Sequence, residues 1–160
     1  MNFYDLFLNK IKNHLRYTKL HYFILNFKNP RYIKFIKKEK KFHKNFLVPG
    51  KLIFDLGANM GDKSHIFSFF TKKIILYEPE EILIDKLKLR FRKYKSIIII
   101  SKLVTDKIGE STFYSILGNE SYSSILKNYN KDFDHLKNVE VTTKKKITTT
   151  LNFEIEKYGT

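Results

Sequence analysis

An acidic residue followed by spaced glycines stands in the stretch KLIFDLGANMGDKS, residues 51–64. An apolar run ends at Asp55, and Gly57, Asn59 and Gly61 follow at every second position. A glycine-rich turn between a strand and a helix lets a ligand approach the backbone, and the amides at the helix start point toward that ligand. A carboxylate at Asp55 would repel the pyrophosphate of a dinucleotide and attract a cation. The stretch therefore predicts a loop for a ligand that carries positive charge.

A second acid, Glu78, ends the next apolar run, KIILYEP. One carboxylate offers two acceptor oxygens, which suit the two hydroxyls of a ribose. Sites for NAD share this second acid, but Asp55 and Glu78 together favour S-adenosylmethionine, which has a sulfonium, an ammonium and no phosphate. Two plainer interpretations stay open. The Asp-x-Gly turn could be purely structural, and Glu78-Pro79 could simply end a strand.

The elements that would position these residues alternate between strand and helix. Short apolar runs predict buried strands at 51–57, 73–79 and 96–100. Helical periodicity predicts helices at 62–70 and 81–94 between them. Strand, helix, strand, helix, strand indicates an α/β fold with right-handed parallel crossovers.

Several side chains have an expected place in these helices. Asp62 is predicted as an N-terminal cap, and Ile82, Leu83, Leu87 and Phe91 are expected to face the sheet. His65 could lie near the loop as a base, but a surface position on its helix is the favoured interpretation.

The pattern changes after Leu103 and Val104. STFYSI alternates like a half-exposed strand, VEVTTKKKITTTL is β-branched and extended, and NFEIEKYG is helical. The polar stretch 118–138 between the strands predicts a long loop with some helix. We expect a β-hairpin-like extension after the three parallel strands.

The first part of the chain, residues 1–47, is predicted as a basic amphipathic helical segment. Residues 1–50 hold 12 of the 31 cationic side chains and only 2 of the 16 anionic ones. Helices are predicted at 3–27 and 32–45, the second with Ile33, Phe35, Ile36 and Phe42 beside a run of lysines.

Three interpretations of this segment remain open. Its apolar stripe could pack on the domain and leave the lysines in solvent. It could instead dock on an anionic membrane surface or on a protein partner. Nucleic acid is the least favoured partner, because 27 of the 31 cations are Lys whereas specific phosphate recognition depends on Arg.

The composition excludes several other classes. The chain has no cysteine, which excludes disulfides and thiolate metal sites, and its five histidines do not pair at short spacing, so no metal is predicted. No apolar run approaches the roughly 18 residues of a membrane-spanning helix. With no secretory signal, the cytoplasm is the expected location. Peripheral membrane contact through residues 1–45 is the alternative.

Four blocks occur in an order that resembles the FkbM family of S-adenosylmethionine-dependent methyltransferases. They are FDLGANMGDKSHIF, ILYEPEE, VTDKIGESTFYS and VTTKKKITTTLNFEIEKYG. The resemblance covers residues 46–159. It implies a class I, Rossmann-like fold and O-methylation of a hydroxyl on a sugar, a lipid or another small molecule.

The resemblance also assigns roles to single residues. The cofactor loop matches Asp55, Gly57, Asn59 and Gly61. Glu78 matches the ribose acid, and Leu103 and Val104 fall where the adenine ring lies. Ser123 and Ser124 match a serine pair that would face the substrate or solvent. No catalytic base is predicted.

One departure from the family concerns the end of the sequence. In the family, the EKYG block is followed by a fourth core strand and the rest of the sheet, whereas this sequence ends at Thr160. We therefore expect residues 48–160 to form an incomplete, N-terminal half of the methyltransferase fold, with its first strand at a sheet edge that a partner chain could complete. An inactive truncated relative, one half of a split enzyme and a basic binding module are the alternatives.

Overall fold

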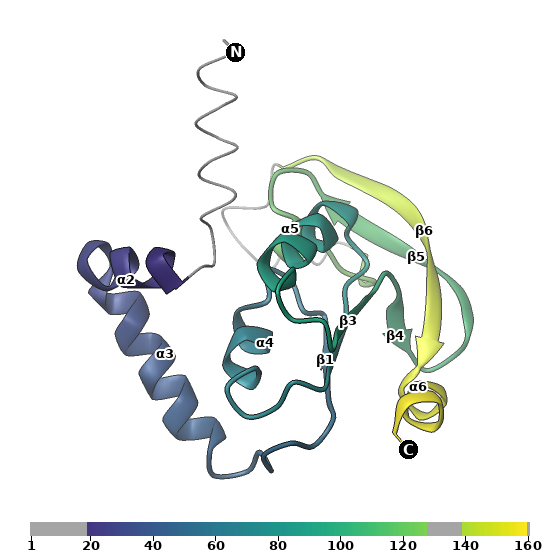
Figure 1. The fold of residues 1–160 in the computed structure, drawn as a ribbon. Coiled ribbons are helices and arrows are strands. Elements are labelled where there is room, and N and C mark those ends of the chain that lie inside the picture. Colours follow the sequence, from purple (N-terminus) through teal and green to yellow (C-terminus); the bar gives the residue numbers. More distant parts are fainter. Residues whose placement is uncertain (1–18, 128–138, 160) are drawn as a thin grey trace.

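A parallel three-stranded sheet forms the centre of the protein (Figure 1). The computed structural model describes residues 19–127 and 139–159. Strands β1 (Ile53–Leu56), β2 (Ile74–Tyr77) and β3 (Ile97–Ile100) pair in the order β1-β2-β3, so β1 lies at an edge as predicted. Every residue of β2 is buried. The predicted α/β class with parallel crossovers is confirmed.

Helix α5 (Glu81–Phe91) packs on this sheet through one face. Leu87 and Phe91, one helical turn apart, belong to the same buried hydrophobic cluster as Ile74 and Leu76 of β2. The prediction that Ile82 faces the sheet is wrong, since 48% of this side chain is exposed. It lies about 100° around the helix from the buried Leu83.

Helix α4 (Asp62–Phe67) is shorter than predicted and begins differently. Its N-cap is Gly61, whose φ of 77° lies in the left-handed region, so the predicted cap at Asp62 is wrong. Asp62 is the first residue of the helix, and its carboxylate instead accepts a hydrogen bond from Arg90 at 2.8 Å. The capping interaction is lost because the sharp turn before the helix needs the glycine at the cap position.

A second, mixed sheet follows. It contains β4 (Leu103–Thr105), β5 (Gly109–Ile116) and β6 (Val141–Thr150) in the order β4-β6-β5, with a short 3₁₀ helix η1 (Glu120–Tyr122) after β5. The antiparallel pair β5–β6 matches the expected hairpin-like extension, and β6 also pairs in parallel with β4. Part of the predicted 118–138 loop lies outside the described residues.

Helix α6 (Leu151–Tyr158) ties the second sheet to the first. The hydroxyl of Tyr77 in β2 donates to Glu154 Oε2 at 2.7 Å, and Thr149 donates to Glu154 Oε1 at 2.7 Å. Tyr77 and Glu154 are both 1% exposed. Burial and this hydrogen bond raise the pKa of Tyr77, so the phenol stays protonated and keeps donating.

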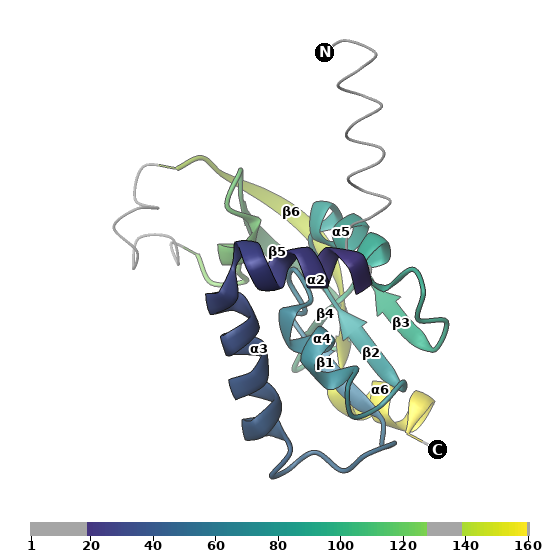
Figure 2. The same ribbon diagram turned by 60° about the vertical axis from the view of Figure 1, so that its left-hand side comes forward.

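Two further helices precede the sheet, α2 (Lys19–Lys28) and α3 (Pro30–His43). Figure 2 shows α2 set at an angle across the start of α3. Asn29 caps α3 by accepting from the Tyr32 amide at 3.1 Å, and Pro30 fixes the first turn. Among the described residues, no helix combines the length and apolar character that a membrane crossing requires.

Fewer side chains of α3 pack against the domain than the sequence predicted. Ile36 and His43 are buried, and the His43 ring contacts Phe67 of α4 at 5.3 Å. Phe35 and Phe42, expected in the packed stripe, are 41% and 59% exposed. The boundary at residues 47 and 48 stays a prediction, as does the part of the 3–27 helix that lies outside the described residues.

Candidate ligand-binding site

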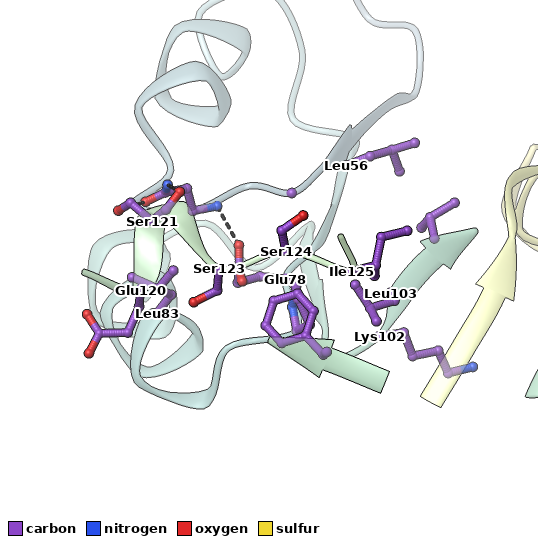
Figure 3. Close-up of a pocket in the computed structure, with 15 residues that line it drawn as sticks. Leu56, Glu78, Leu83, Lys102, Leu103, Glu120, Ser121, Ser123, Ser124 and Ile125 are labelled. Atoms are coloured by element: carbon purple, nitrogen blue, oxygen red, sulfur yellow. Dashed lines mark hydrogen bonds between the residues drawn. The ribbon is translucent and has the colours of Figure 1, made fainter. Parts of the chain in front are cut away.

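A cavity of about 310 Å³ lies past the carboxyl ends of β1 and β2, where they face the second sheet (Figure 3). Seven of the nine site residues predicted from the sequence line it. These are Gly57, Asn59, Glu78, Leu103, Val104, Ser123 and Ser124. The edge formed by strand ends is where ligands bind in open α/β folds.

Glu78 is the most tightly held acid of this cavity. Its side chain is 4% exposed. Its Oε2 accepts from the Asn59 amide at 2.7 Å, and its Oε1 accepts from the Glu80 amide at 2.9 Å. Because a carboxylate oxygen has two lone pairs, each oxygen keeps capacity for one ligand hydroxyl. Burial raises the pKa of Glu78 despite the two amides that favour its charged form.

The loop between β1 and α4 presents its backbone to the cavity. Gly57 has φ 72° and Asn59 has φ 52°, so both use the left-handed region, which suits glycine and is tolerated by asparagine. The amides of Gly57 and Ala58 donate to the carbonyl of Tyr77 at 2.9 and 3.0 Å. These bonds fix the loop against the end of β2.

Asp55 lies in an adjoining cavity of about 380 Å³, which shares Gly57, Asn59 and Ser121 with the first. Its Oδ2 accepts a hydrogen bond from the Ser64 hydroxyl. Burial raises the pKa of Asp55, and the hydrogen bonds from Ser64 offset only part of that rise. A cationic ligand beside Asp55 would favour the charged carboxylate.

Gly61 has a packing role. It lines neither of these two cavities. A Cβ at this position would lie 2.7 Å from Leu87 Cδ2 and 2.8 Å from Phe91 Cε2. The absence of a side chain at Gly61 thus lets the start of α4 pack closely against α5, which fixes the end of the loop after β1.

The end of the first cavity away from Glu78 is mainly apolar. Figure 3 shows Leu56, Leu103 and Ile125 on that side, with Lys102 beside Leu103, while Glu78 and Ser123 lie toward the other end. A flat heteroaromatic ring suits such a slot, because its faces bind apolar side chains.

Ser123 and Ser124 both line the cavity, and both are also used by the protein itself. Ser123 Oγ accepts from the Ile116 amide at 3.0 Å, and Ser124 Oγ accepts from the Leu126 amide at 3.1 Å. Each hydroxyl oxygen is therefore engaged in shaping its loop, while its proton stays available to a ligand.

Sequence reasoning missed several lining residues, including Phe113, Glu120 and Ser121. Ser121 donates to Asn59 Oδ1 at 2.9 Å, which joins the loop after β5 to the loop after β1. The alternation of STFYSI could have indicated Phe113 as an inward residue. Nothing local in the sequence places Ser121 beside Asn59.

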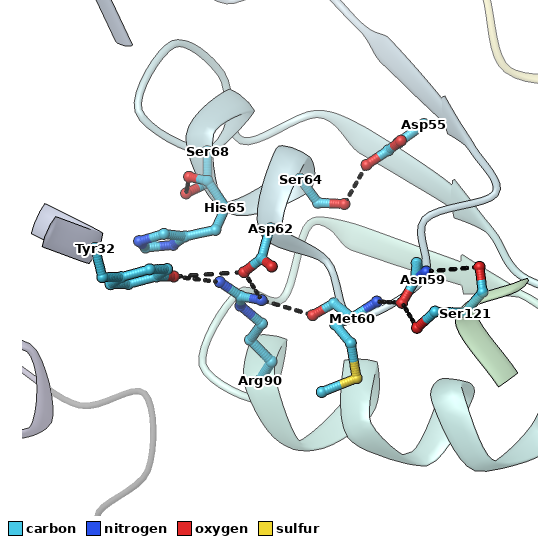
Figure 4. A network of polar contacts seen from close by, with 10 residues as sticks. All are labelled: Tyr32, Asp55, Asn59, Met60, Asp62, Ser64, His65, Ser68, Arg90 and Ser121. Atoms are coloured by element: carbon cyan, nitrogen blue, oxygen red, sulfur yellow. Dashed lines mark hydrogen bonds and ion pairs between the residues drawn. The ribbon is translucent and has the colours of Figure 1, made fainter. Parts of the chain in front are cut away.

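A buried arginine braces the other side of the loop (Figure 4). Arg90 of α5 donates to the Met60 carbonyl at 2.6 Å and to Asp62 at 2.8 Å. It also donates to the Tyr32 hydroxyl of α3 at 3.3 Å. One guanidinium thus connects the loop, α4 and α3.

The expectation that His65 lies on a helix surface is wrong. This side chain is 7% exposed, and its ring contacts Phe69 at 5.1 Å. Burial, followed by the nearby Arg90 charge, lowers the pKa of His65 to about 4. It lines neither of the two cavities, so the structure gives it a place in packing.

Comparisons with known proteins add no identification. No family model matches the chain, and no curated protein matches it. Within residues 19–127 and 139–159, no three metal-ligating side chains come together. The fold itself is α/β, with a three-stranded parallel sheet and interleaved helices.

Proposed function

We propose that this protein binds S-adenosylmethionine in the cavity beside Glu78 and directs its methyl group to a hydroxyl acceptor, as an O-methyltransferase of the FkbM type. One observation carries the proposal. The buried carboxylate of Glu78 lies at the end of β2 and accepts hydrogen bonds from two backbone amides. On one side of it is the glycine-containing loop after Asp55, and on the other is the apolar part of the cavity lined by Leu103.

Each part of the site has a role in this proposal. Glu78 accepts the ribose hydroxyls, and Leu103 and Val104 flank the adenine ring. Asp55 faces the cationic end of the ligand from the adjoining cavity. The bound ligand supplies an electrophilic methyl group, and the protein holds it in a fixed position for an acceptor oxygen.

The two acids also support S-adenosylmethionine over a dinucleotide. A pyrophosphate at the loop would meet Asp55, whose burial already disfavours one negative charge. A second negative charge in the same low-dielectric region would raise that cost. The sulfonium and ammonium groups have the opposite effect.

Titration calorimetry on the full chain tests the proposal. We expect saturable heat with S-adenosylmethionine at up to millimolar concentration and none with NAD. Binding of NAD with the higher affinity would replace the proposal by a dinucleotide site. Absence of heat with both ligands would reject it.

A further inference from the structure

Helix α2 carries an apolar stripe that faces solvent. Leu20, Phe23, Ile24 and Phe27 follow the spacing of one helical face. Phe23 is 63% exposed and Phe27 is 71% exposed. Their rings meet edge to face with centroids 5.1 Å apart, so the two side chains form one surface unit. We call these four residues the α2 stripe.

Helix α3 adds a second set of exposed aromatic rings. Phe35 and Phe42 stand two turns apart, and Phe46 follows the helix, 5.0 Å from the Phe42 ring. All three are exposed. The packed side of α3 is occupied by Ile36 and His43, so these phenylalanines are not part of the domain core.

The helix that carries these rings also carries a strong positive charge. Six exposed cationic side chains lie on α3 or directly after its end. They are Arg31, Lys34, Lys37, Lys38, Lys41 and Lys44, which we call the α3 cations. The one acid of this helix, Glu39, is engaged by Lys63 and by His43. The α3 cations are therefore not neutralised within their own helix.

The chemistry of this surface fits a lipid bilayer better than other partners. Apolar side chains beside lysines bind at the boundary between headgroups and acyl chains, and anionic headgroups attract the lysines. Five of the six α3 cations are Lys, which disfavours specific nucleic-acid recognition. A second copy of the chain would bring like charges together.

We propose that the α2 stripe and the α3 cations form a docking surface for an anionic phospholipid bilayer. Figure 1 shows α2 and α3 on the side of the molecule away from the second sheet. The docked protein therefore keeps β4–β6 off the membrane. The inference does not depend on the proposed methyl transfer.

Vesicle flotation of the full chain tests the proposal. The vesicles contain phosphatidylcholine alone or phosphatidylcholine mixed with phosphatidylserine, each at low and physiological salt. We expect binding to the mixed vesicles that weakens as salt rises. Phe23→Ser/Phe27→Ser should lower the affinity by about tenfold or more, because two rings leave the acyl boundary. Phe153→Ser, on the exposed face of α6, is the matched control and should bind as the unchanged chain does.

The cations are tested separately. Lys34→Ser/Lys38→Ser should weaken binding to the mixed vesicles by about fivefold for each lysine removed. Lys93→Ser/Lys95→Ser, past the end of α5, is the control. Circular dichroism establishes that each variant is folded.

Four outcomes would overturn the proposal. The first is no binding to either vesicle type. The second is equal loss of binding in the control variants. The third is tighter binding to single-stranded RNA than to the mixed vesicles. The fourth is a dimer in light scattering that Phe23→Ser/Phe27→Ser dissociates, which would assign the surface to a second copy.

Discussion

Asp55 and Glu78 are two carboxylates that folding removes from water, and burial raises the pKa of each. Each therefore destabilises the unliganded fold in its charged form. Neither acid completes the hydrophobic core, and both line a cavity. Buried acids with a raised pKa are typical of ligand sites. There the bound ligand replaces the interactions with water that the carboxylate loses on folding.

At Glu78, the test is a change that removes the charge and keeps the shape. Hydrogen bonds to a charged group contribute about 1.5–3 kcal/mol, so Glu78→Gln should lower the affinity for S-adenosylmethionine by roughly 10- to 100-fold. Glu81→Gln is the matched control, because Glu81 is exposed and pairs with Lys146 at 3.0 Å. If calorimetry shows that both variants lose the same affinity, or that neither loses any, Glu78 does not contact the ligand.

At Asp55, the prediction concerns stability against pH. A carboxyl whose pKa rises on folding binds more protons in the native state, so its contribution to stability falls as pH rises from the ordinary value of 3.8 through the raised one. Asp55→Asn should therefore raise the Tm at neutral pH and lose that gain below 3.8. The same change should weaken binding of S-adenosylmethionine.

Thermal unfolding across this pH range checks the Asp55 prediction. Asp106→Asn is the control, since Asp106 is exposed between β4 and β5. A lower Tm for Asp55→Asn at neutral pH would show that the charged carboxylate stabilises the unliganded fold, contrary to the argument.

At the scale of elements, the contact between α4 and α5 depends on Gly61. Gly61→Ala combines a left-handed φ with a Cβ less than 3 Å from Leu87 and Phe91, so it should lower the free energy of unfolding by about 2–4 kcal/mol. Gly118→Ala has a similar φ of 76° and nothing within 4 Å, and should cost about 1–2 kcal/mol. Urea unfolding compares the two. Equal losses would mean that the close packing at Gly61 contributes nothing.

At the scale of elements, the sequence predicted those helices and strands that follow from the local pattern of apolar residues. Three short apolar runs predicted β1, β2 and β3, and the spacing of Leu83, Leu87 and Phe91 predicted the buried side of α5. Features that depend on distant packing were missed. His65 is buried, with the charges of Arg90 in α5 and Lys40 in α3 close enough to act on its ring, and no pattern within its own helix reveals that.

The same distinction applies to the candidate site. Gly57, Asn59 and Glu78 were found because they lie in motifs at strand ends. Ser121 and Phe113 reach the cavity only through the folding of the second sheet against the first. β6 pairs with both β4 and β5, so it joins residues that are 25 to 45 positions apart in the sequence. Local periodicity does not reveal such pairings.

At the scale of the whole molecule, the two sheets are joined through the buried pair Tyr77 and Glu154. Tyr77→Phe would leave Glu154 Oε2 without this donor, at a cost of about 1–3 kcal/mol in the free energy of unfolding. Tyr158→Phe, on the half-exposed side of α6, should cost less than about 0.5 kcal/mol. Chemical denaturation that ranks Tyr158→Phe as the more damaging change would contradict this view of the junction.

The central claim is that S-adenosylmethionine binds in the cavity beside Glu78, with its cationic end in the adjoining cavity at Asp55. The most direct measurement is an amide-resolved NMR titration of the full chain with this ligand. The account predicts that the largest shifts fall on Gly57, Asn59, Glu78 and Leu103, whose backbone or side chains border the cavity. Shifts concentrated elsewhere, or a spectrum unchanged at millimolar ligand, would contradict it.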